Sequence, residues 1–484
     1  MTRELRRVTL LIFAMFAALL VSTTTIQYAQ AGNLAADSRN VRTLYESYST
    51  QRGPILVKGT PIASSVPSAD NYKYLRSYAD GPMYSAVTGF YPVNGEPTGL
   101  EYSMNAELSG TSSGQFFDRL KRLVTGQVPV GASVETTIDP VAQKAAWDAL
   151  GSYTGSVIVT EPATGRIVAM VSKPGYDPNI LAVHEGNKVD ASYRALTSDP
   201  GSPLINRAIS GNLNPPGSVF KLVVASAALE SGRYTGDSEL PNPGALTLPG
   251  TTAVVHNSDD GTCGSGATAT IATALRLSCN IPFAELGMEL GGGAIRAQAE
   301  KYGFNSTFTI PMTTAASVYP RVLDVPQTGL SAFGQGNDRV TPIQMAIVSS
   351  TIANGGMVMV PSVVESVTAP DLTPISGFNP ATRGRAISEK TATALTRMMV
   401  DNVRDGAASN ARIEGVAVAG KTGTAENGTT DPYTLWFTGF APADNPRYAI
   451  TVLVENGGGL GQTGYGNLVA APIAKKVLEA VLKK

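Results

Sequence analysis

Histidine and cysteine are scarce in this chain of 484 residues, which contains two of each. His184 and His256 are too few for a histidine-rich metal site. If the protein is a hydrolase or an acyltransferase, its general base is therefore not expected to be histidine. Charge is also sparse, at 15% of residues with a net charge of −1, and this balance gives no indication of a nucleic-acid partner.

A coiled coil is not expected either, because the chain contains 50 glycines and 31 prolines. This composition indicates a loop-rich globular fold. The chain is longer than one ordinary domain, so two or more domains are predicted. The sequence shows no internal repeat and no low-complexity segment.

The N-terminal segment combines a basic tip with a long uncharged stretch. Three arginines lie among the first seven residues, and no charge follows from Val8 to Ala36. This pattern predicts that the basic tip stays in the cytoplasm and the rest is exported. Two interpretations remain open at this point. The apolar run 8–21 and the Ala-Gln-Ala sequence at 29–31 resemble a cleavable signal peptide, whereas the uncharged stretch 8–28 is long enough for a membrane anchor.

Apolar patterning predicts one sheet built from both ends of the chain. Two β-rich runs around a turn predict a hairpin at 156–172, and the late part of the chain contains three more strand-like runs. We therefore predict an α+β fold, with the intervening helical material packed on the sheet. The remaining predicted elements are a helix at 115–126, a strand followed by a helix that ends at Gly151, a loop-like segment from 173 to 214, a strand at 416–426, a hairpin at 435–456 and a closing helix at 468–484.

A serine and a lysine three residues apart open the apolar segment 214–229. Two prolines and a glycine precede Ser218, so it is expected in the first turn of a helix, where free N–H groups favour negative charge. Lys221 lies on the same helix face. Its apolar neighbours remove solvent, which lowers the pKa of the lysine and makes a neutral amine available to activate Ser218.

The alternative interpretation of this pair is structural. Serine is a preferred helix N-cap, and lysines occur freely on helices. Taken alone, a Ser-x-x-Lys pair is more often structural than catalytic. Lys221 is, however, the only lysine in the chain with a serine three residues before it.

Two further motifs follow in order along the chain. Residues Ser278–Asn280 read Ser-Cys-Asn, a Ser-x-Asn pattern that is weak alone because it recurs elsewhere. Residues Lys421–Gly423 read Lys-Thr-Gly, a tripeptide that occurs once and is followed by Thr424. The ordered set is the signature of penicillin-recognising serine transpeptidases and β-lactamases, and it is far stronger evidence than any single member.

The chain resembles the class B penicillin-binding proteins, and in particular the penicillin-binding protein A subfamily. The similarity rests on QRGPIL, TTIDPVAQKAAWDAL, NPPGSVFK, SAFGQGNDRVTPIQMA and KTGTAE. It implies a serine-type peptidoglycan D,D-transpeptidase that cross-links stem peptides through an acyl-enzyme and is inhibited by β-lactams. The fold it implies is the serine β-lactamase/transpeptidase-like α+β fold, an antiparallel sheet of about five strands with helices on its faces.

The resemblance also divides the chain into three parts. Residues 1–30 are expected to form a cytoplasmic tip and an uncleaved transmembrane signal-anchor in the plasma membrane. Residues 31–150 are expected to form an N-terminal non-catalytic domain, too short for a glycosyltransferase. Residues 151–484 are expected to form the penicillin-binding transpeptidase domain outside the cytoplasm.

The first two motifs supply the catalytic groups that the resemblance implies. Ser218 attacks the carbonyl of the penultimate D-Ala of a stem peptide and releases the last D-Ala. Lys221 is the base, and Ser278 relays a proton between Lys221 and the leaving or attacking amine. Asn280 binds an amide of the donor peptide.

The third motif supplies the substrate-binding groups that the resemblance implies. Lys421 and the hydroxyls of Thr422 and Thr424 bind the substrate carboxylate. Gly423 allows the substrate backbone to pair along the strand edge. The backbone N–H groups of Ser218 and Thr424 form the oxyanion hole.

The implied partners are stem peptides, β-lactams, the membrane and a separate glycosyltransferase with other cell-wall synthesis proteins, in a role in cell shape or cell division. No metal, cofactor or nucleic acid is implied. Two alternatives remain open: a D,D-carboxypeptidase and a non-catalytic β-lactam sensor on the same scaffold. No acidic residue is identified as a water-activating base, which argues against a β-lactamase.

Cys263 and Cys279, the only cysteines, lie 16 residues apart. An even number of cysteines in an exported protein favours a disulfide, which would pin the turn that carries Ser278 and Asn280. Two buried free thiols are the alternative, because the distance between the two Cα atoms depends on the fold.

Overall fold

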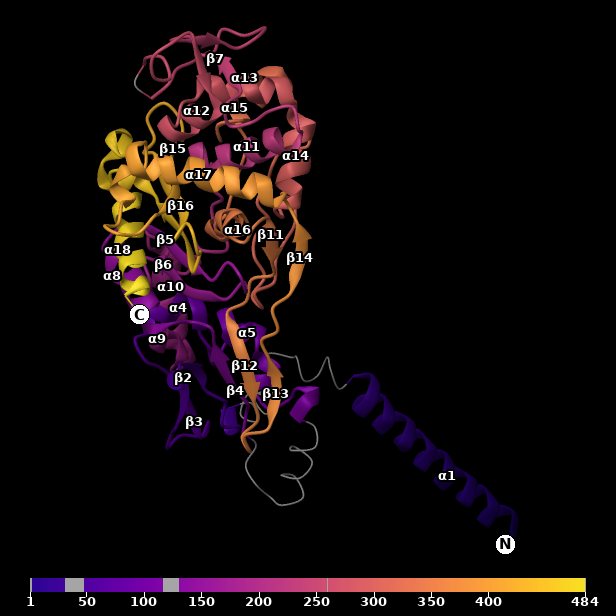
Figure 1. Cartoon of the computed structure of the whole chain (residues 1–484). Coiled ribbons are helices and arrows are strands. Elements are labelled where there is room, and N and C mark those ends of the chain that lie inside the picture. The colour runs from indigo at the N-terminus through magenta and orange to yellow at the C-terminus, as the bar shows by residue number, and fades with distance from the viewer. Residues whose placement is uncertain (1, 31–47, 116–129, 259, 484) are drawn as a thin grey trace.

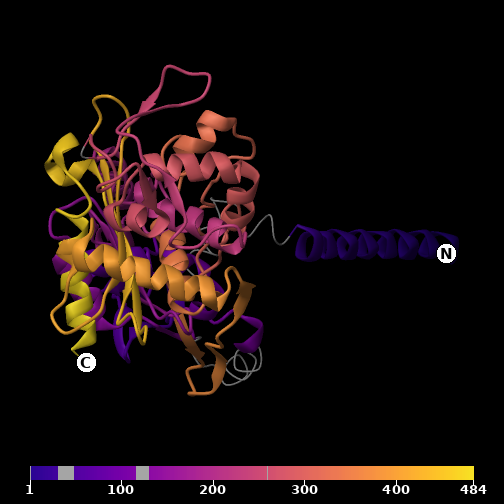
Figure 2. The same ribbon diagram turned by 45° about the horizontal axis from the view of Figure 1, so that its top comes forward.

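The computed structural model describes residues 2–30, 48–115, 130–258 and 260–483. Figure 1 shows an elongated body with one sheet near its middle, a group of helices at one end and a second sheet at the other end. Figure 2 shows the same arrangement from a view turned by 45°. The functional motifs lie between the middle sheet and the group of helices.

The middle sheet has five antiparallel strands in the order β15-β16-β17-β5-β6. Early and late segments of the chain therefore meet in one sheet, as predicted, and both predicted hairpins are confirmed. β15 is an edge strand, so one side of its backbone is free of strand pairing. The strands are β5 (Gly155–Thr160), β6 (Ile167–Lys173), β15 (Ala419–Ala425), β16 (Thr434–Ala441) and β17 (Tyr448–Val454).

Helices cover both faces of this sheet. α8 (Pro140–Leu150) and α18 (Ala470–Leu482) pack on the face that carries Val157, whereas α16 (Pro342–Ala353) packs on the face that carries Ile158. Adjacent strand residues point to opposite faces, so a β-strand that is apolar throughout needs cover on both sides. The predicted helices that end at Gly151 and near the C-terminus are confirmed.

The group of helices beyond the sheet contributes α11 (Lys221–Glu230), which is buried on almost every side. Its neighbours include α13 and α14, and α17 runs from this group to β15. The other helices of the group are α12 (Ile271–Leu277), α13 (Ile281–Leu290), α14 (Gly292–Lys301), α15 (Val325–Ser331) and α17 (Glu389–Asp405).

The second sheet has six strands in the order β13-β12-β4-β1-β2-β3. Two of them, β12 and β13, come from the C-terminal half of the chain, while α8, which ends at residue 150, packs on the middle sheet. The two regions exchange elements, and the boundary at residue 150 stays a prediction. The strands are β1 (Ile55–Val57), β2 (Thr60–Pro67), β3 (Tyr74–Tyr78), β4 (Ser133–Thr136), β12 (Val364–Thr368) and β13 (Pro374–Gly377).

One local prediction is wrong, and another lies outside the described residues. The prediction of a loop-like segment from 173 to 214 is wrong, because α10 (Gly186–Ser198) lies within it. Val189, Tyr193 and Leu196 recur at the spacing of one helix face, but this short stripe lies among polar residues and was overlooked. The helix predicted at 115–126 lies outside the described residues, apart from Gln115 at its start.

Short elements complete the described chain. They are the helices α4 (Gly81–Thr88), α5 (Gly99–Ser103), α6 (Asn105–Leu108) and α9 (Asn179–Ala182), the strands β7 (Glu239–Pro241), β8 (Leu246–Thr247), β9 (Val254–Val255), β10 (Thr268–Thr270), β11 (Met357–Met359) and β14 (Thr382–Arg385), and the turns η2 (Ser113–Gln115), η3 (Gly217–Phe220), η4 (Ser409–Ala411), η5 (Asn456–Gly459) and η6 (Gly461–Thr463).

The N-terminal segment forms α1 (Thr2–Thr24), which continues as the π-helical turn η1 (Thr25–Ala29). An 18-residue window within the span Arg3–Tyr28 has a mean hydropathy of 2.1, and none of that window is buried against the rest of the protein. The span is long and apolar enough to cross a membrane. A signal sequence meets the same criteria, so length and hydropathy do not choose between the two.

Candidate active site

Ser218 lies in the 3₁₀ turn η3, immediately before α11. The predicted helix start is therefore close to the observed one, with a tighter first turn. Neighbouring segments hold this turn in place: the N–H of Gly217 donates to the carbonyl of Gly334 over 3.0 Å, and Nε1 of Trp436 donates to the carbonyl of Pro215 over 3.0 Å. Gly217 has a φ of 54°, a left-handed conformation that favours glycine.

Lys221 is completely buried directly behind the serine. Its Nζ lies 2.9 Å from Oγ of Ser218, 2.7 Å from the carbonyl oxygen of Ser278 and 2.9 Å from Oδ1 of Asn280. Burial holds the pKa of Lys221 well below its usual value, and the positive charge of Lys421 lowers the pKa further. Both effects disfavour the protonated form of this amine.

Ser278 connects the two lysines of the site. It follows the last residue of α12 in a left-handed conformation, with a φ of 65°. Its carbonyl oxygen accepts a hydrogen bond from Lys221, and its Oγ accepts one from Nζ of Lys421 over 2.6 Å. One residue thus touches both amines, through two different atoms.

The loop before residue 263 holds Asn280. Oδ1 of Asn257 accepts the N–H groups of Asn280 and Ile281 over 2.8 and 3.0 Å. Nδ2 of Asn280 donates to the carbonyl of His256 over 3.0 Å. With its Oδ1 on Lys221, the Asn280 side chain has a partner on both ends, which fixes the orientation of its amide.

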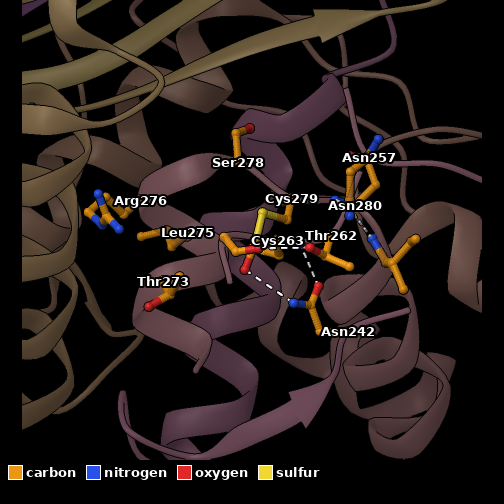
Figure 3. Close-up of a disulfide and its surroundings, with 12 residues drawn as sticks. Asn242, Asn257, Thr262, Cys263, Thr273, Leu275, Arg276, Ser278, Cys279 and Asn280 are labelled. Atoms are coloured by element: carbon orange, nitrogen blue, oxygen red, sulfur yellow. Dashed lines mark hydrogen bonds between the residues drawn. A yellow bond between two sulfur atoms is a disulfide. The ribbon is translucent and has the colours of Figure 1, made fainter. Parts of the chain in front are cut away.

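Cys263 and Cys279 form a disulfide, and neither cysteine is a free thiol. Figure 3 shows this bond beside Ser278 and Asn280. Asn242 holds the Cys263 end, since its Oδ1 accepts the N–H of Cys263 over 2.6 Å. The disulfide therefore joins the loop that positions Asn280 to the middle residue of the Ser-x-Asn motif.

Lys421 lies in edge strand β15 and is completely buried. Besides Oγ of Ser278, its Nζ contacts the carbonyl oxygen of Thr422 over 2.9 Å. Burial lowers the pKa of Lys421 from 10.5 to about 7. The charge of this amine therefore changes near neutral pH.

The two threonines of β15 already have partners within the protein. Oγ1 of Thr422 donates to the carbonyl of Ala407 over 2.9 Å, and Oγ1 of Thr424 accepts the N–H of Gly466 over 3.1 Å. The Thr424 hydroxyl keeps its own hydrogen for a further acceptor, whereas the Thr422 hydroxyl has donated its hydrogen. The predicted carboxylate contacts of both residues stay predictions.

Gly423 allows β15 to pack directly against η3, the turn that carries the predicted nucleophile Ser218 and is called the nucleophile turn below. A Cβ at this position would lie 2.9 Å from the carbonyl oxygen of Pro216 and 3.2 Å from Cγ1 of Val219. The sequence suggested a different reason for this glycine, a close approach of the substrate. The structure adds a packing requirement of the protein itself.

An open groove of about 1080 Å³ runs over these residues. Ser218, Ser278, Asn280 and Thr424 line it, together with wall segments that include residues 254–258 and 462–467. Lys221 and Lys421 lie beneath its surface with no exposed area. The groove therefore offers a hydroxyl nucleophile above two buried amines, an arrangement suited to acyl transfer without histidine.

All eight residues predicted from the three motifs meet at this groove. Sequence reasoning missed the residues that hold them, because their roles depend on backbone contacts with distant segments. The glycine-rich tract near residue 466 and the Gly-Gln-Gly sequence at 334–336 were visible in the sequence, but without a predicted partner. The missed residues are Asn257, Gly334, Trp436 and Gly466.

Comparisons with protein families identify two regions. Residues 155–479 match the model of the penicillin binding protein transpeptidase domain. Residues 52–134 match the model of the penicillin binding protein A dimerisation domain.

Curated proteins and solved structures give full-length similarities. The chain is 41% identical to peptidoglycan D,D-transpeptidase PbpA of Mycolicibacterium smegmatis, over 100% of both chains. It is 39% identical to the protein of the same name from Mycobacterium tuberculosis, over 100% of this chain and 99% of that protein. The ceftriaxone acyl-enzyme complex of penicillin-binding protein A from M. tuberculosis matches with a TM-score of 0.87 and 38% identity, over 90% of this chain and 100% of the other.

Proposed function

The chain belongs to the family of penicillin-binding protein transpeptidases, and from this premise we propose that it is a serine-type peptidoglycan D,D-transpeptidase that β-lactams acylate and inhibit. One observation carries the proposal: Nζ of Lys221, with no exposed area, lies 2.9 Å from Oγ of Ser218. A buried amine at this distance is a base for a serine nucleophile.

The contacts of Lys221 support this role for a neutral amine. Two of its neighbours, the carbonyl of Ser278 and Oδ1 of Asn280, only accept hydrogen bonds, and the third is the Ser218 hydroxyl. A neutral amine has two N–H bonds for the two acceptors and one lone pair for the hydroxyl. Ser218 then donates its proton to Nζ as Oγ bonds to the carbonyl carbon of the penultimate D-Ala.

The acyl-enzyme forms when the bond between this carbon and the nitrogen of the last D-Ala breaks. The leaving nitrogen takes the proton that Lys221 received. Ser278 passes it on once its hydroxyl turns from Lys421 towards Nζ of Lys221, which in the structure contacts the carbonyl oxygen of Ser278. The free D-Ala departs. An acceptor amine then attacks the ester, returns a proton to Ser218 by the same route and forms the new peptide bond.

A β-lactam follows the first half of this course. Ser218 opens the strained ring amide, but the leaving nitrogen stays tethered to the acyl group. It continues to occupy the place of the acceptor, so the ester persists.

The remaining motif residues bind and polarise the donor. Lys421 supplies positive charge to the substrate carboxylate, Thr424 donates its free hydroxyl hydrogen to the same group, and Thr422 adds a further contact if its hydroxyl rotates away from the protein. The N–H groups of Ser218 and Thr424 bind the developing oxyanion. The close packing of the nucleophile turn on β15 supports this pairing, because a Cβ on Gly217 would lie 2.8 Å from the carbonyl oxygen of Thr424.

The decisive experiment treats the protein with benzylpenicillin and locates the adduct by peptide mass spectrometry. One acyl group is expected on the peptide that contains Ser218, and Ser218→Ala is expected to remain unlabelled while it still melts cooperatively. Labelling of the alanine variant would exclude Ser218 as the nucleophile. An added amine acceptor separates a transpeptidase from a D,D-carboxypeptidase. A transpeptidase transfers the acyl group to the amine and gives a cross-linked product, whereas a carboxypeptidase gives the hydrolysed peptide, and both release D-Ala.

The N-terminal helix supports a single-pass anchor in the plasma membrane, with the catalytic region outside the cytoplasm. Because the family match covers a transpeptidase region and a dimerisation region, a separate glycosyltransferase is the expected partner for glycan synthesis. Protease added to intact spheroplasts should digest the catalytic region. Protection of that region would exclude this topology.

A further inference from the structure

Glu426 lies at the end of the groove, and the proposed acyl transfer assigns it no role. It follows Ala425, the last residue of β15, and lines the same groove as Ser218. Its side chain is exposed and forms no hydrogen bond or ion pair with any residue that the structure describes. Strand alternation places it on the face of Thr424, about 7 Å further along the edge.

Tyr433 forms the neighbouring wall of the groove. Ala425 pairs with Thr434 in the sheet, so the next positions, Glu426 and Tyr433, lie beside each other where β15 and β16 meet the loop. Burial raises the pKa of the Tyr433 hydroxyl, and the negative charge of Glu426 raises it further. A carboxylate beside an aromatic ring attracts a cation through charge and through the ring face. An anionic group would instead be repelled by the carboxylate.

The loop between these two residues is held in one conformation. Nδ2 of Asn427 donates to the carbonyl of Pro432 over 2.6 Å, and Nε2 of Gln462 donates to the carbonyl of Asp431 over 3.1 Å. The side chain of Glu426 therefore projects from a braced segment, which reduces the entropy lost when a ligand binds.

The sign of the charge changes along the groove. Its described lining contains two carboxylates, Glu426 and Asp260, and neither lysine nor arginine. The cation assigned to the anionic end of the substrate, Lys421, lies beneath the groove near Ser278. A ligand that is anionic at one end and cationic at the other matches this distribution.

We propose that Glu426 and Tyr433 bind a side-chain ammonium group of a stem peptide; this inference rests on the proposed function. A transpeptidase requires an amine on its acceptor, and one polymer supplies both acceptors and donors, so donors carry the same amine. With a pKa of about 10.4, such an amine is an ammonium ion at neutral pH. A donor that pairs with β15 advances about 3.3 Å per residue, which brings the residue before the scissile D-Ala towards Glu426.

The test uses two donor peptides that end in D-Ala-D-Ala and differ only in the side-chain amine of the preceding residue, free in one and acetylated in the other. The readout is the ratio of kcat/KM for D-Ala release from the two donors. Wild-type protein is expected to prefer the free amine by about fivefold, the scale of one partly exposed charge contact, and added salt should reduce this preference. Because the ratio is measured on one variant at a time, a general loss of activity cancels.

Glu426→Gln is expected to abolish the preference. Glu414→Gln, which removes another exposed carboxylate outside the groove lining, should keep it. A second arm fixes the acetylated donor and varies the concentration of a free-amine acceptor. A raised acceptor KM in Glu426→Gln alone would support the ammonium site and assign it to the acceptor.

Three results would overturn the inference. The first is equal rates for both donors in the wild-type protein together with an unchanged acceptor KM in Glu426→Gln. The second is a preference for the free amine that survives Glu426→Gln, and the third is slower hydrolysis of the penicilloyl-enzyme as the sole effect of that variant. The last result would assign the carboxylate to water activation. A wild-type protein that benzylpenicillin does not acylate would instead contradict the proposed function.

Discussion

Two buried lysines determine the chemistry of the site at the scale of residues. Each has lost its hydration, and Ser278 is hydrogen-bonded to both of them. Two positive charges this close to one residue repel each other strongly in the protein interior, where water does not screen them. Protonation of one amine therefore disfavours protonation of the other. The pair therefore disfavours double protonation, which agrees with the proposed roles of Lys221 as a base and of Lys421 as the cation for a substrate carboxylate.

Replacement of Lys221 by arginine tests whether its neutral form is required. A guanidinium keeps the charge but does not become neutral in proteins, so it is not a base. The rate of acylation by a fluorescent penicillin is expected to fall by about 10²–10⁴-fold, the usual contribution of a general base. Thermal melting serves as the control for folding. Near-normal acylation of a folded variant would limit Lys221 to a structural role.

The pH dependence of acylation reports on Lys421. Its pKa is lowered to about 7, so the free protein loses this charge as the pH rises through that value. If the ammonium binds the β-lactam carboxylate, the second-order rate of acylation should fall on the alkaline side of about pH 7, because this rate reports the free enzyme. Lys421→Arg, which stays charged, should lack this alkaline decrease. A profile that is flat above neutral pH in the wild-type protein would contradict the assignment.

At the scale of elements, three contacts assemble the site. β15 packs on the nucleophile turn through Gly423, α12 ends at the serine that touches both lysines, and the loop before Cys263 fixes Asn280. The disulfide joins that loop to the end of α12. Each contact joins a short motif to a segment far away in the sequence.

Gly423→Ala tests the contact between β15 and the nucleophile turn. The added Cβ would lie 2.9 Å from a backbone oxygen of Pro216, so the strand or the turn must move. We expect a loss of about 1–3 kcal/mol in the free energy of unfolding, measured by urea denaturation, together with slower penicillin acylation. Gly377→Ala in β13 is the matched control, since its Cβ would meet no atom within 4 Å. Equal behaviour of the two variants would show that close packing at Gly423 is not required.

At the scale of the whole molecule, early and late segments are interleaved. The middle sheet joins β5 and β6 to three strands from the end of the chain, and the second sheet takes β12 and β13 from the C-terminal half. The two regions are therefore expected to unfold together rather than as separate units. α1 takes no part in either sheet and is exposed along its length.

Deletion of residues 1–30 tests the anchor. The truncated protein is expected in the soluble fraction, with penicillin acylation at a rate within about twofold of the full chain, because none of the exposed span is buried against the catalytic region. Fractionation and labelling with fluorescent penicillin measure both properties. Retention of the truncated protein in the membrane fraction would show that another segment binds the membrane.

The sequence by itself determined the strands of the middle sheet, its α+β character, the apolar N-terminal helix and the three motifs. These features depend on local patterns: the alternation of apolar residues, a proline–glycine turn, or residue types at short spacing. It missed α10, whose apolar residues Val189, Tyr193 and Leu196 form only a short stripe among polar residues.

Only the tertiary structure decided how the motifs act on one another. The contacts of Ser278 with both lysines, the use of the Thr422 hydroxyl by Ala407, the disulfide and the support of Asn280 by Asn257 each join segments that are separated along the chain. The same is true of β12 and β13 in the second sheet. Local sequence patterns do not encode which distant segments meet, because that choice follows from the packing of the whole core.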